Sequence, residues 1–186
     1  MALALPVLVA LALGLVLGGR LSGFAQLELR ATWLFFVPVA LQVVAFPFGF
    51  MPWSTEGRVA TALWLVSYGT LVVAAALNAR ITGVPIVAAG MCLNLLAILA
   101  NHGTMPVRPG AMRAAGDDYA TNANSTAMAD PHLGWLTDRW AAPDVIPLAN
   151  VFSVGDVVIA VGAIVIVLSA MGVRLPRPLK SRSASL

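Results

Sequence analysis

Five long apolar stretches constrain this chain more than any other feature of its sequence. They cover residues 2–19, 33–50, 59–78, 85–101 and 154–172. A helix needs roughly 20 apolar residues to cross the hydrocarbon layer of a bilayer, and each stretch reaches or approaches that length. No strand-like alternation of apolar and polar residues competes with a helical interpretation. The sequence therefore predicts an all-α, polytopic membrane helix bundle with five transmembrane helices.

The composition agrees with a membrane environment. Of the 186 residues, 60% are hydrophobic and only 10% are charged. A soluble domain of this size could not bury so many apolar side chains, because much of its surface faces water. We expect one integral membrane domain over residues 1–186. The first stretch has no basic residue before it and no clear cleavage site, so we interpret it as a retained helix rather than a signal peptide.

Cysteine content and charge exclude some classes of protein. The one cysteine, Cys92, cannot build a disulfide framework or a thiolate metal site within one chain, and we expect it to be a small buried hydrophobe. The net charge of +3 lies mostly in short loops and the tail. This charge indicates topology and gives no case for nucleic-acid binding.

Basic residues in the loops predict the orientation, because they gather on the cytoplasmic side. With five helices and an inner C-terminus, the N-terminus lies outside, and residues 173–186 form a basic cytoplasmic tail. The basic residues then expected inside are Arg20, Arg30, Arg80, Arg174, Arg177, Lys180 and Arg182. Those left outside are Arg58, Arg108, Arg113 and Arg139.

The long polar segment 102–152 is predicted to form an extracytoplasmic loop cap. Its most ordered-looking piece begins at Asp130, a suitable N-cap, and Pro131, a suitable first helical residue. Three apolar residues then recur at i, i+3 and i+7, namely Leu133, Leu136 and Trp140. This spacing predicts a short amphipathic helix that lies on the bilayer surface or across the mouth of the bundle.

Small residues at regular spacing predict where helices pack closely. Gly14 and Gly18 form a GxxxG pair in the first stretch. In the last stretch, Gly155, Gly162 and Ser169 recur every seven residues, which keeps one seam facing a partner helix.

The loop "GTMPVRPG" at 103–110 contains two prolines, which fix their own backbone and bias the preceding residues toward extended conformations. We expect a stiff, extended piece that holds Met105 against the bundle. Among polar residues in the apolar stretches, Asn94 is the best placed to touch a ligand, with interhelical hydrogen bonding as the alternative. No ionisable residue lies deep in a stretch, which argues against a proton relay or an ion-coupled carrier.

Three residues near the outer face could meet. His102 and Arg108 follow the fourth stretch, and Asp156 begins the fifth. Together they could hold an anionic or quinone-like head group, and the alternative is a solvated rim. Asp156 also has a structural interpretation, because "SVGD" places it three residues after Ser153 in a variant of the capping box. The two histidines, His102 and His132, lack carboxylates at ligand-like spacing, so no metal site is predicted.

The motifs "NHGTMPV" and "SVGD", with "HLGWLTDRWAAPDVIPLANVF" between them, make the chain similar to a known family. It resembles domain of unknown function 5317, a family of small bacterial multi-helix membrane proteins. The matching positions are Asn101, Gly103, Met105, Pro106, Val107, Ser153, Gly155 and Asp156, and His102 departs from the pattern, where a small residue is more usual. The resemblance implies a multi-pass protein of the bacterial plasma (inner) membrane and implies no activity or cofactor.

The leading functional hypothesis is a non-enzymatic small or accessory subunit of a membrane complex, or a homo-oligomer, with a lipid or quinone-like molecule between its helices. Membrane lipids are its expected partners. The alternatives are a small-molecule transporter or channel, and a membrane-embedded enzyme that acts on a lipid-like substrate at the outer face. No catalytic residue is predicted, and the candidate ligand-binding residues are Asn94, Asn101, His102, Met105, Arg108 and Asp156.

Overall fold

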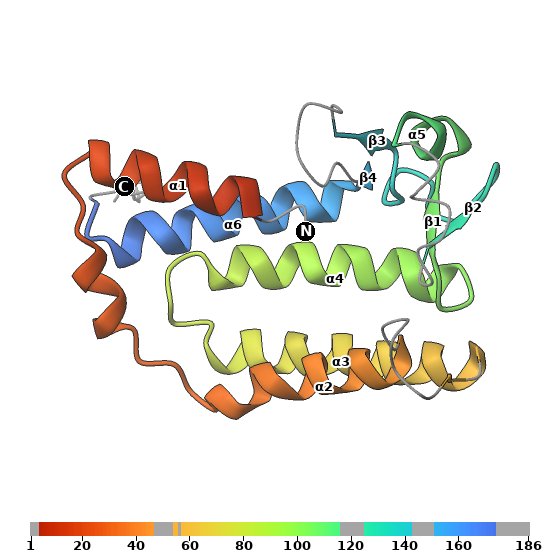
Figure 1. Cartoon of the computed structure of the whole chain (residues 1–186), viewed down its shortest axis with the longest axis horizontal. Helices are drawn as coiled ribbons and strands as arrows, with labels where there is room; N and C mark the ends of the chain where they lie inside the picture. The colour runs from red at the N-terminus through yellow and green to blue at the C-terminus, as the bar shows by residue number, and fades with distance from the viewer. Residues whose placement is uncertain (1–3, 47–53, 56, 116–124, 143–150, 174–186) are drawn as a thin grey trace, which may run out of the picture.

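The structure is a computed structural model that describes residues 4–46, 54–55, 57–115, 125–142 and 151–173. Within these ranges the chain is mainly helical, which confirms the predicted helical class (Figure 1). The longer helices are α1 Ala4–Val16, α2 Phe36–Ala45, α3 Gly57–Leu77, α4 Val84–Ala100 and α6 Val154–Ala170. Shorter helical pieces are η1 Leu21–Gln26, η2 Thr32–Phe35 and α5 Pro109–Ala114.

The five longer helices lie side by side in the order α1, α6, α4, α3, α2 (Figure 1). Successive helices along the chain run in opposite directions, so α1, α3 and α6 point one way, and α2 and α4 point the other way. The turns that join η1 to η2 and α3 to α4 lie at one end of the bundle. The strands and α5 lie at the other end and form the cap.

The helices are shorter than the apolar stretches that predicted them. Among the described residues only α3, with 21 residues, is long and apolar enough to cross a membrane, judged by length and composition alone. The other apolar helices have 10–17 residues. The prediction of five transmembrane helices is therefore not supported. Local backbone explains part of the difference, because Gly18 (φ 80°) follows the end of α1 and Gly83 (φ 96°) precedes α4 in left-handed conformations.

Helices α4 and α6 pack through glycines. A methyl group added to Gly90 would lie 2.6 Å from the carbonyl oxygen of Gly155, and one added to Gly162 would lie 2.7 Å from the backbone nitrogen of Val87. Both distances are far below van der Waals contact, so the two backbones could not approach this closely with any larger residue. The predicted packing role of Gly155 and Gly162 is confirmed.

Helix α1 covers another face of α6 through Ala10, which packs with Val167 and Met171. Gly14 also lies against Met171, so its predicted packing role is confirmed. Gly18 does not share that role, because nothing lies within 4 Å of a Cβ built there. Its positive φ serves the turn after α1 instead.

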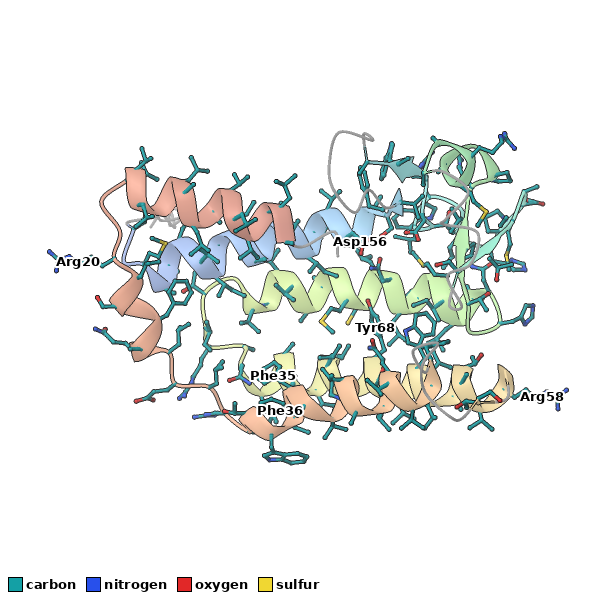
Figure 2. The ribbon with its side chains drawn as sticks, viewed as in Figure 1. Arg20, Phe35, Phe36, Arg58, Tyr68 and Asp156 are labelled. Carbon is teal, nitrogen blue, oxygen red and sulfur yellow. The ribbon has the colours of Figure 1, made fainter. Side chains whose placement is uncertain are left out.

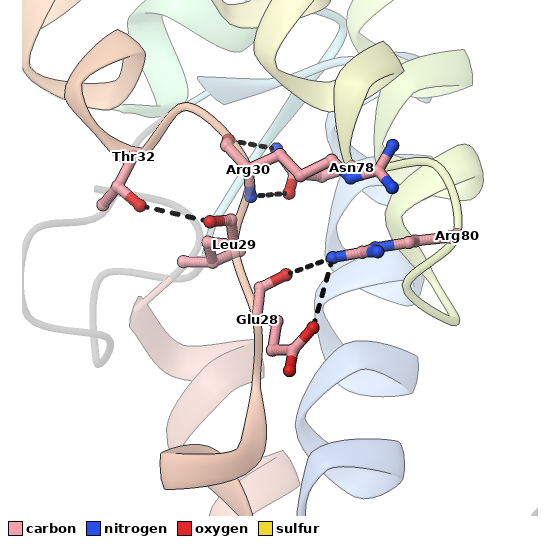
Figure 3. A network of polar contacts seen from close by, with 6 residues as sticks. All are labelled: Glu28, Leu29, Arg30, Thr32, Asn78 and Arg80. Carbon is pink, nitrogen blue, oxygen red and sulfur yellow. Dashed lines mark hydrogen bonds and ion pairs between the residues drawn. The ribbon is translucent and has the colours of Figure 1, made fainter.

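Asn78 joins two segments at the end of the bundle opposite the cap (Figure 3). Its amide accepts a hydrogen bond from the Arg30 nitrogen at 2.8 Å and donates to the Arg30 oxygen at 3.0 Å and to the Ala74 oxygen at 2.8 Å. Beside it, Arg80 donates to the Glu28 carbonyl oxygen at 3.1 Å and lies 3.7 Å from the Glu28 carboxylate. These contacts fasten the segment between η1 and η2 to the end of α3.

The cap contains short strands. β1 Met105–Val107 pairs in parallel with β2 Ser125–Ala127, and β3 Trp140–Ala141 pairs antiparallel with β4 Val151–Phe152. Met105 is buried in a core cluster with Trp64, Ala97, Ile98 and Leu136. The prediction that an extended segment holds Met105 against the bundle is confirmed.

The prediction of an amphipathic helix in the cap is wrong. Residues 132–136 form turns, and Leu133 adopts a left-handed conformation with φ 52°. The reason is tertiary: Asn101 binds the backbone N–H and C=O of His132, both at 2.9 Å, and Leu136 enters the core. The cap has instead a short helix, α5, that was not predicted. Residues 116–124 and 143–150 of the predicted cap, and 174–186 of the predicted tail, lie outside the described residues.

Cys92 also differs from its prediction. It lies on α4 and is exposed rather than buried. An apolar run does not reveal which of its residues face the neighbouring helices, and Cys92 lies on a face that the described residues leave uncovered.

Candidate functional site

A cavity of about 1000 Å³ lies between α2 and α3 on one side and α4 and α6 on the other. Apolar side chains make up most of its lining. Six polar side chains also line it, and they are Gln42, Tyr68, Asn78, Asn94, Asp138 and Asp156. Four of these, Tyr68, Asn94, Asp138 and Asp156, come from elements that meet near the cap, and we call these four residues the polar cluster.

Asn94 and Asp156 belong to one hydrogen-bond network between α4 and α6. The Asn94 amide nitrogen donates to Asp156 Oδ1 at 2.9 Å, and Ser153 Oγ lies 2.9 Å from Asn94 Oδ1 and 2.8 Å from Asp156 Oδ2. The backbone nitrogen of Ser153 also donates to Asp156 Oδ2, at 2.9 Å. Both carboxylate oxygens therefore accept hydrogen bonds, and the carboxylate is fixed in position.

The same network confirms the predicted capping box. Ser153 Oγ accepts a hydrogen bond from the Asp156 backbone nitrogen at 3.1 Å, and Asp156 accepts one from the Ser153 backbone nitrogen. The side chain of Asn94 lies directly over Gly155, where any Cβ would displace it. A glycine at this position is what allows Asn94 to reach the start of α6.

Tyr68 approaches the network from α3. Its side chain lies beside Asn94, and its ring packs edge-on against Trp64, with centroids 6.2 Å apart and an interplanar angle of 69°. Figure 2 shows Tyr68 extending from α3 toward α4, while Asp156 extends from α6 toward α4 from the other side. Helix α4 therefore carries the polar contacts between the two halves of the bundle.

Asp138 reaches the cavity from the cap. It is buried, and its backbone is held in place because its nitrogen donates to the Pro106 oxygen at 3.0 Å and its oxygen accepts from the Arg108 nitrogen at 2.9 Å. Burial, and secondly the negative charge of Asp156, raises the pKa of Asp138 to about 7. Near neutral pH this side chain therefore exchanges between its charged and its neutral form.

The predicted site residues separate into two groups. Asn94, Met105 and Asp156 line the cavity. Asn101 instead ties the end of α4 to the backbone of His132.

His102 and Arg108 also lie away from the cavity. His102 is exposed, with φ 59°, and Arg108 lines a separate surface groove of about 720 Å³ with Trp135 and Arg139. The structure does not place His102 or Arg108 in the cavity that Asp156 lines, so the meeting of these three residues that the sequence allowed is not observed.

Tyr68, Asp138 and Trp64 belong to the site but were not predicted. Tyr68 was visible as a polar residue in an apolar stretch, and this was its only local sign. Asp138 had no local sign in the sequence. Its position depends on a β-bridge with Val107, which lies 31 residues earlier in a different part of the loop. Within the described residues, no group of three or more His, Cys, Asp or Glu side chains could hold a metal ion.

Comparison with known proteins gives a family and no relative of known structure. Residues 26–168, well over half of the chain, match the sequence profile of a family of unknown function. No curated protein and no solved structure matches. The match begins within the η1 segment and ends close to the end of α6, so it includes the whole cavity except its edge at α1. It confirms the resemblance drawn from the motifs at residues 101–107 and 153–156, and the chain belongs to the family of unknown function DUF5317.

Proposed function

We propose that this protein is an integral protein of the bacterial plasma membrane that holds an amphiphilic molecule, of the lipid or quinone type, in the cavity between α3 and α4. The cavity carries this proposal. Its volume of about 1000 Å³ lies at the upper end of the range for small-molecule sites, roughly 300–1,000 Å³, which typically have apolar walls and a few polar groups.

Exposed apolar side chains support the membrane environment. Large ones occur on all five longer helices, for example Leu8, Phe36, Val73, Leu99 and Val161. In the most apolar 18-residue window of α3 only 28% is buried, whereas the core helix of a soluble protein is mostly buried. Such surfaces are unfavourable in water and favourable against lipid chains.

We propose that all five longer helices cross the membrane. Helices α4 and α6 have 17 residues each, which is the lower end of the spanning range of roughly 17–25. Helices α1 and α2 are shorter still. For them the proposal relies on local thinning of the bilayer and on flanking residues that reach its surface.

The strictly alternating helix directions suit this arrangement, because each helix then takes the chain to the opposite surface (Figure 1). Figure 2 shows Arg20 and Arg58 at opposite ends of the bundle. The end with Arg20, Arg30 and Arg80, where α6 also ends before the basic tail, would face the cytoplasm. The cap and the N-terminus would then face outward.

The distribution of side chains along the cavity suits an amphiphile. The polar cluster is near the cap, while residues such as Leu71, Val87 and Ile166 provide apolar walls farther from it. Phe35 also lines the cavity, whereas its neighbour Phe36 is exposed on the outer surface (Figure 2). A head group near the cap and a tail along the helices would satisfy both kinds of surface.

The chemistry of the site favours binding over turnover. The network contains one serine hydroxyl, that of Ser153. This hydroxyl already forms hydrogen bonds with Asn94 and within the capping box. The Asp156 carboxylate that accepts from this hydroxyl is itself held by Asn94 and by the Ser153 backbone nitrogen. We therefore propose that the protein is not an enzyme. Its exposed apolar faces provide surfaces for contact with other membrane proteins, so we also propose a role as an accessory subunit of a larger membrane complex.

The test is extraction of the protein in native-membrane nanodiscs, followed by intact-complex mass spectrometry and identification of the molecules released. We expect one amphiphile at fixed stoichiometry. Leu71→Trp, which adds volume inside the cavity, should abolish its retention. Val73→Trp, on the exposed face of the same helix, should leave it unchanged.

An empty wild-type protein, or equal retention in both variants, would contradict the proposal. The same spectra report protein partners, so a second chain at fixed stoichiometry would establish the accessory-subunit role separately.

A further inference from the structure

We propose that the head group held in this cavity is cationic, an amine or a quaternary ammonium attached to an apolar tail. The inference rests on the proposed function and narrows it to one class of amphiphile. It starts from the charges that line the cavity and from the aromatic side chains beside them.

The charged lining residues are all acidic. Asp138 comes from the cap and Asp156 from α6, and among the described residues that line the cavity there is no Lys, Arg or His. The cap arginines Arg108 and Arg139 line the separate surface groove. The described lining therefore favours a cation over an anion, because both acids are negatively charged when deprotonated and no basic side chain of the lining balances them.

The Asp156 carboxylate and the backbone of Asp138 are held in place before any ligand arrives. Asp156 is fixed by the Asn94 amide and by Ser153, with contacts of 2.8–2.9 Å. Asp138 is fixed through its backbone to Pro106 and Arg108. Preorganised acceptors bind a cation without the entropic cost of ordering flexible side chains.

The charge relation between the two acids supports the same conclusion. Burial, and secondly the negative charge of Asp156, disfavours the ionised form of Asp138, as its raised pKa reports, and no attraction to a basic residue offsets these effects. A bound ammonium group would relieve this repulsion by interacting with both carboxylates.

Two aromatic rings complete the environment. Trp64 and Tyr68 line the cavity and pack edge-on at 6.2 Å. Aromatic rings attract ammonium groups through their π faces, and proteins use aromatic side chains to recognise quaternary ammonium ligands. Apolar residues such as Leu71 and Val87 would then contact the tail.

This assignment differs from the head groups that the sequence left open. With a solvated rim as the alternative, the sequence allowed an anionic or quinone-like head group beside Asp156, held by Arg108 and His102. Neither residue lines the cavity, so the basic side chains that would hold an anion are missing from its described lining.

The test uses three probes with the same brominated dodecyl tail and different head groups: trimethylammonium, phosphate and a neutral hydroxyl. Each is titrated into the full-length protein in nanodiscs of uncharged lipid, and binding is followed by quenching of tryptophan fluorescence. We expect the ammonium probe to bind at least about tenfold tighter than the other two, as charge complementarity requires.

Variants separate a specific site from general attraction. Asp138→Asn and Asp156→Asn should each reduce the preference for ammonium by about tenfold. Asp130→Asn, which removes an acid of the separate groove, should leave the preference unchanged. Asp156→Asn also alters the capping box, so circular dichroism confirms folding, and Asp138→Asn carries the conclusion alone if Asp156→Asn unfolds.

Two results would overturn the inference in distinguishable ways. Equal or tighter binding of the phosphate or hydroxyl probe at a site blocked by Leu71→Trp contradicts the cationic head group but leaves amphiphile binding intact. Binding of all three probes unaffected by Leu71→Trp contradicts both proposals, because the probes then do not occupy the cavity.

Discussion

The two sides of α4 are built from opposite kinds of residue. Toward α6, glycines bring the two backbones together, with no room for a methyl group at Gly90 or Gly155. Toward α3, the large side chains of Trp64, Tyr68 and Leu71 stand between the helices and line a cavity of about 1000 Å³. One helix therefore takes part in both a closed and an open interface.

The difference separates structural and binding roles along one short helix. On the closed side, any added volume must displace backbone, so that interface is intolerant of change. On the open side, added volume enters the cavity, so side chains can change in size without displacing a helix. Asn94 links the two sides, because it is buried against Gly155 and also lines the cavity.

Adding one methyl group to the closed side should have the largest effect. In Gly155→Ala the new Cβ would displace the Asn94 side chain and lie 2.8 Å from the Gly90 oxygen. Overpacking of this kind costs on the order of 3 kcal/mol. Thermal unfolding in detergent would measure it. The matched control is Gly69→Ala on α3, where nothing lies within 4 Å, and a midpoint lowered equally by both variants would contradict the closed interface.

Breaking the connection between α4 and the cap should cost somewhat less. Asn101→Ala removes three hydrogen bonds of 2.7–2.9 Å and leaves the backbone of His132 unpaired, at a cost of about 2–3 kcal/mol. Hydrogen exchange should rise at residues 131–138. Asn78→Ala removes the equivalent bonds at the opposite end and should leave exchange in the cap unchanged. Equal protection of the cap in both variants would refute this assignment.

The open side predicts a dependence on pH. The pKa of Asp138 rises from its ordinary value of 3.8 to about 7 in the folded protein. The folded state therefore binds the proton more tightly, and this contribution to stability is fully present below the ordinary value and is lost as the pH rises through about 7. The free energy of unfolding should fall by roughly 2 kcal/mol between about pH 5 and about pH 8.

Unfolding by a denaturant at several pH values would measure this dependence. In Asp138→Asn the slope over this range should disappear, because the side chain no longer titrates. A slope that persists in the variant would show that another group causes it.

The smallest expected loss of stability concerns the start of α6, which contacts Asn94 where the two sides of α4 meet. Ser153→Ala removes the N-cap hydroxyl and its contacts with Asn94 and Asp156, which should lower stability by about 1 kcal/mol. Thr70→Ala is the matched control, because its hydroxyl is exposed and bonds only within α3. A loss in Ser153→Ala no greater than that in Thr70→Ala would exclude a capping contribution.

Features that depend on nearby residues could be predicted from the sequence. The capping box needs only Ser153 and Asp156, and the extended segment at Met105 follows from its flanking prolines, so both predictions were confirmed. The seven-residue spacing of Gly155 and Gly162 predicted a packing seam because helix geometry alone puts them on one face.

Features that depend on distant residues could not be predicted. The stripe at Leu133 and Leu136 is compatible with a helix, but Asn101 holds the backbone at His132 and Leu136 is needed in the core. Asp138 enters the cavity only because it bridges to Val107. The site combines residues from α3, α4, α6 and the cap, and no local pattern indicates that these four meet.

The two asparagines at the ends of α3 and α4 bind only backbone groups of the segments that they contact. Asn78 and Asn101 each pair with one backbone N–H and one backbone C=O, at Arg30 and at His132. Every residue except proline offers these two groups. Residues 30 and 132 can therefore be substituted without loss of these hydrogen bonds. Each asparagine, in contrast, provides a donor and an acceptor in an arrangement that few other side chains can reproduce.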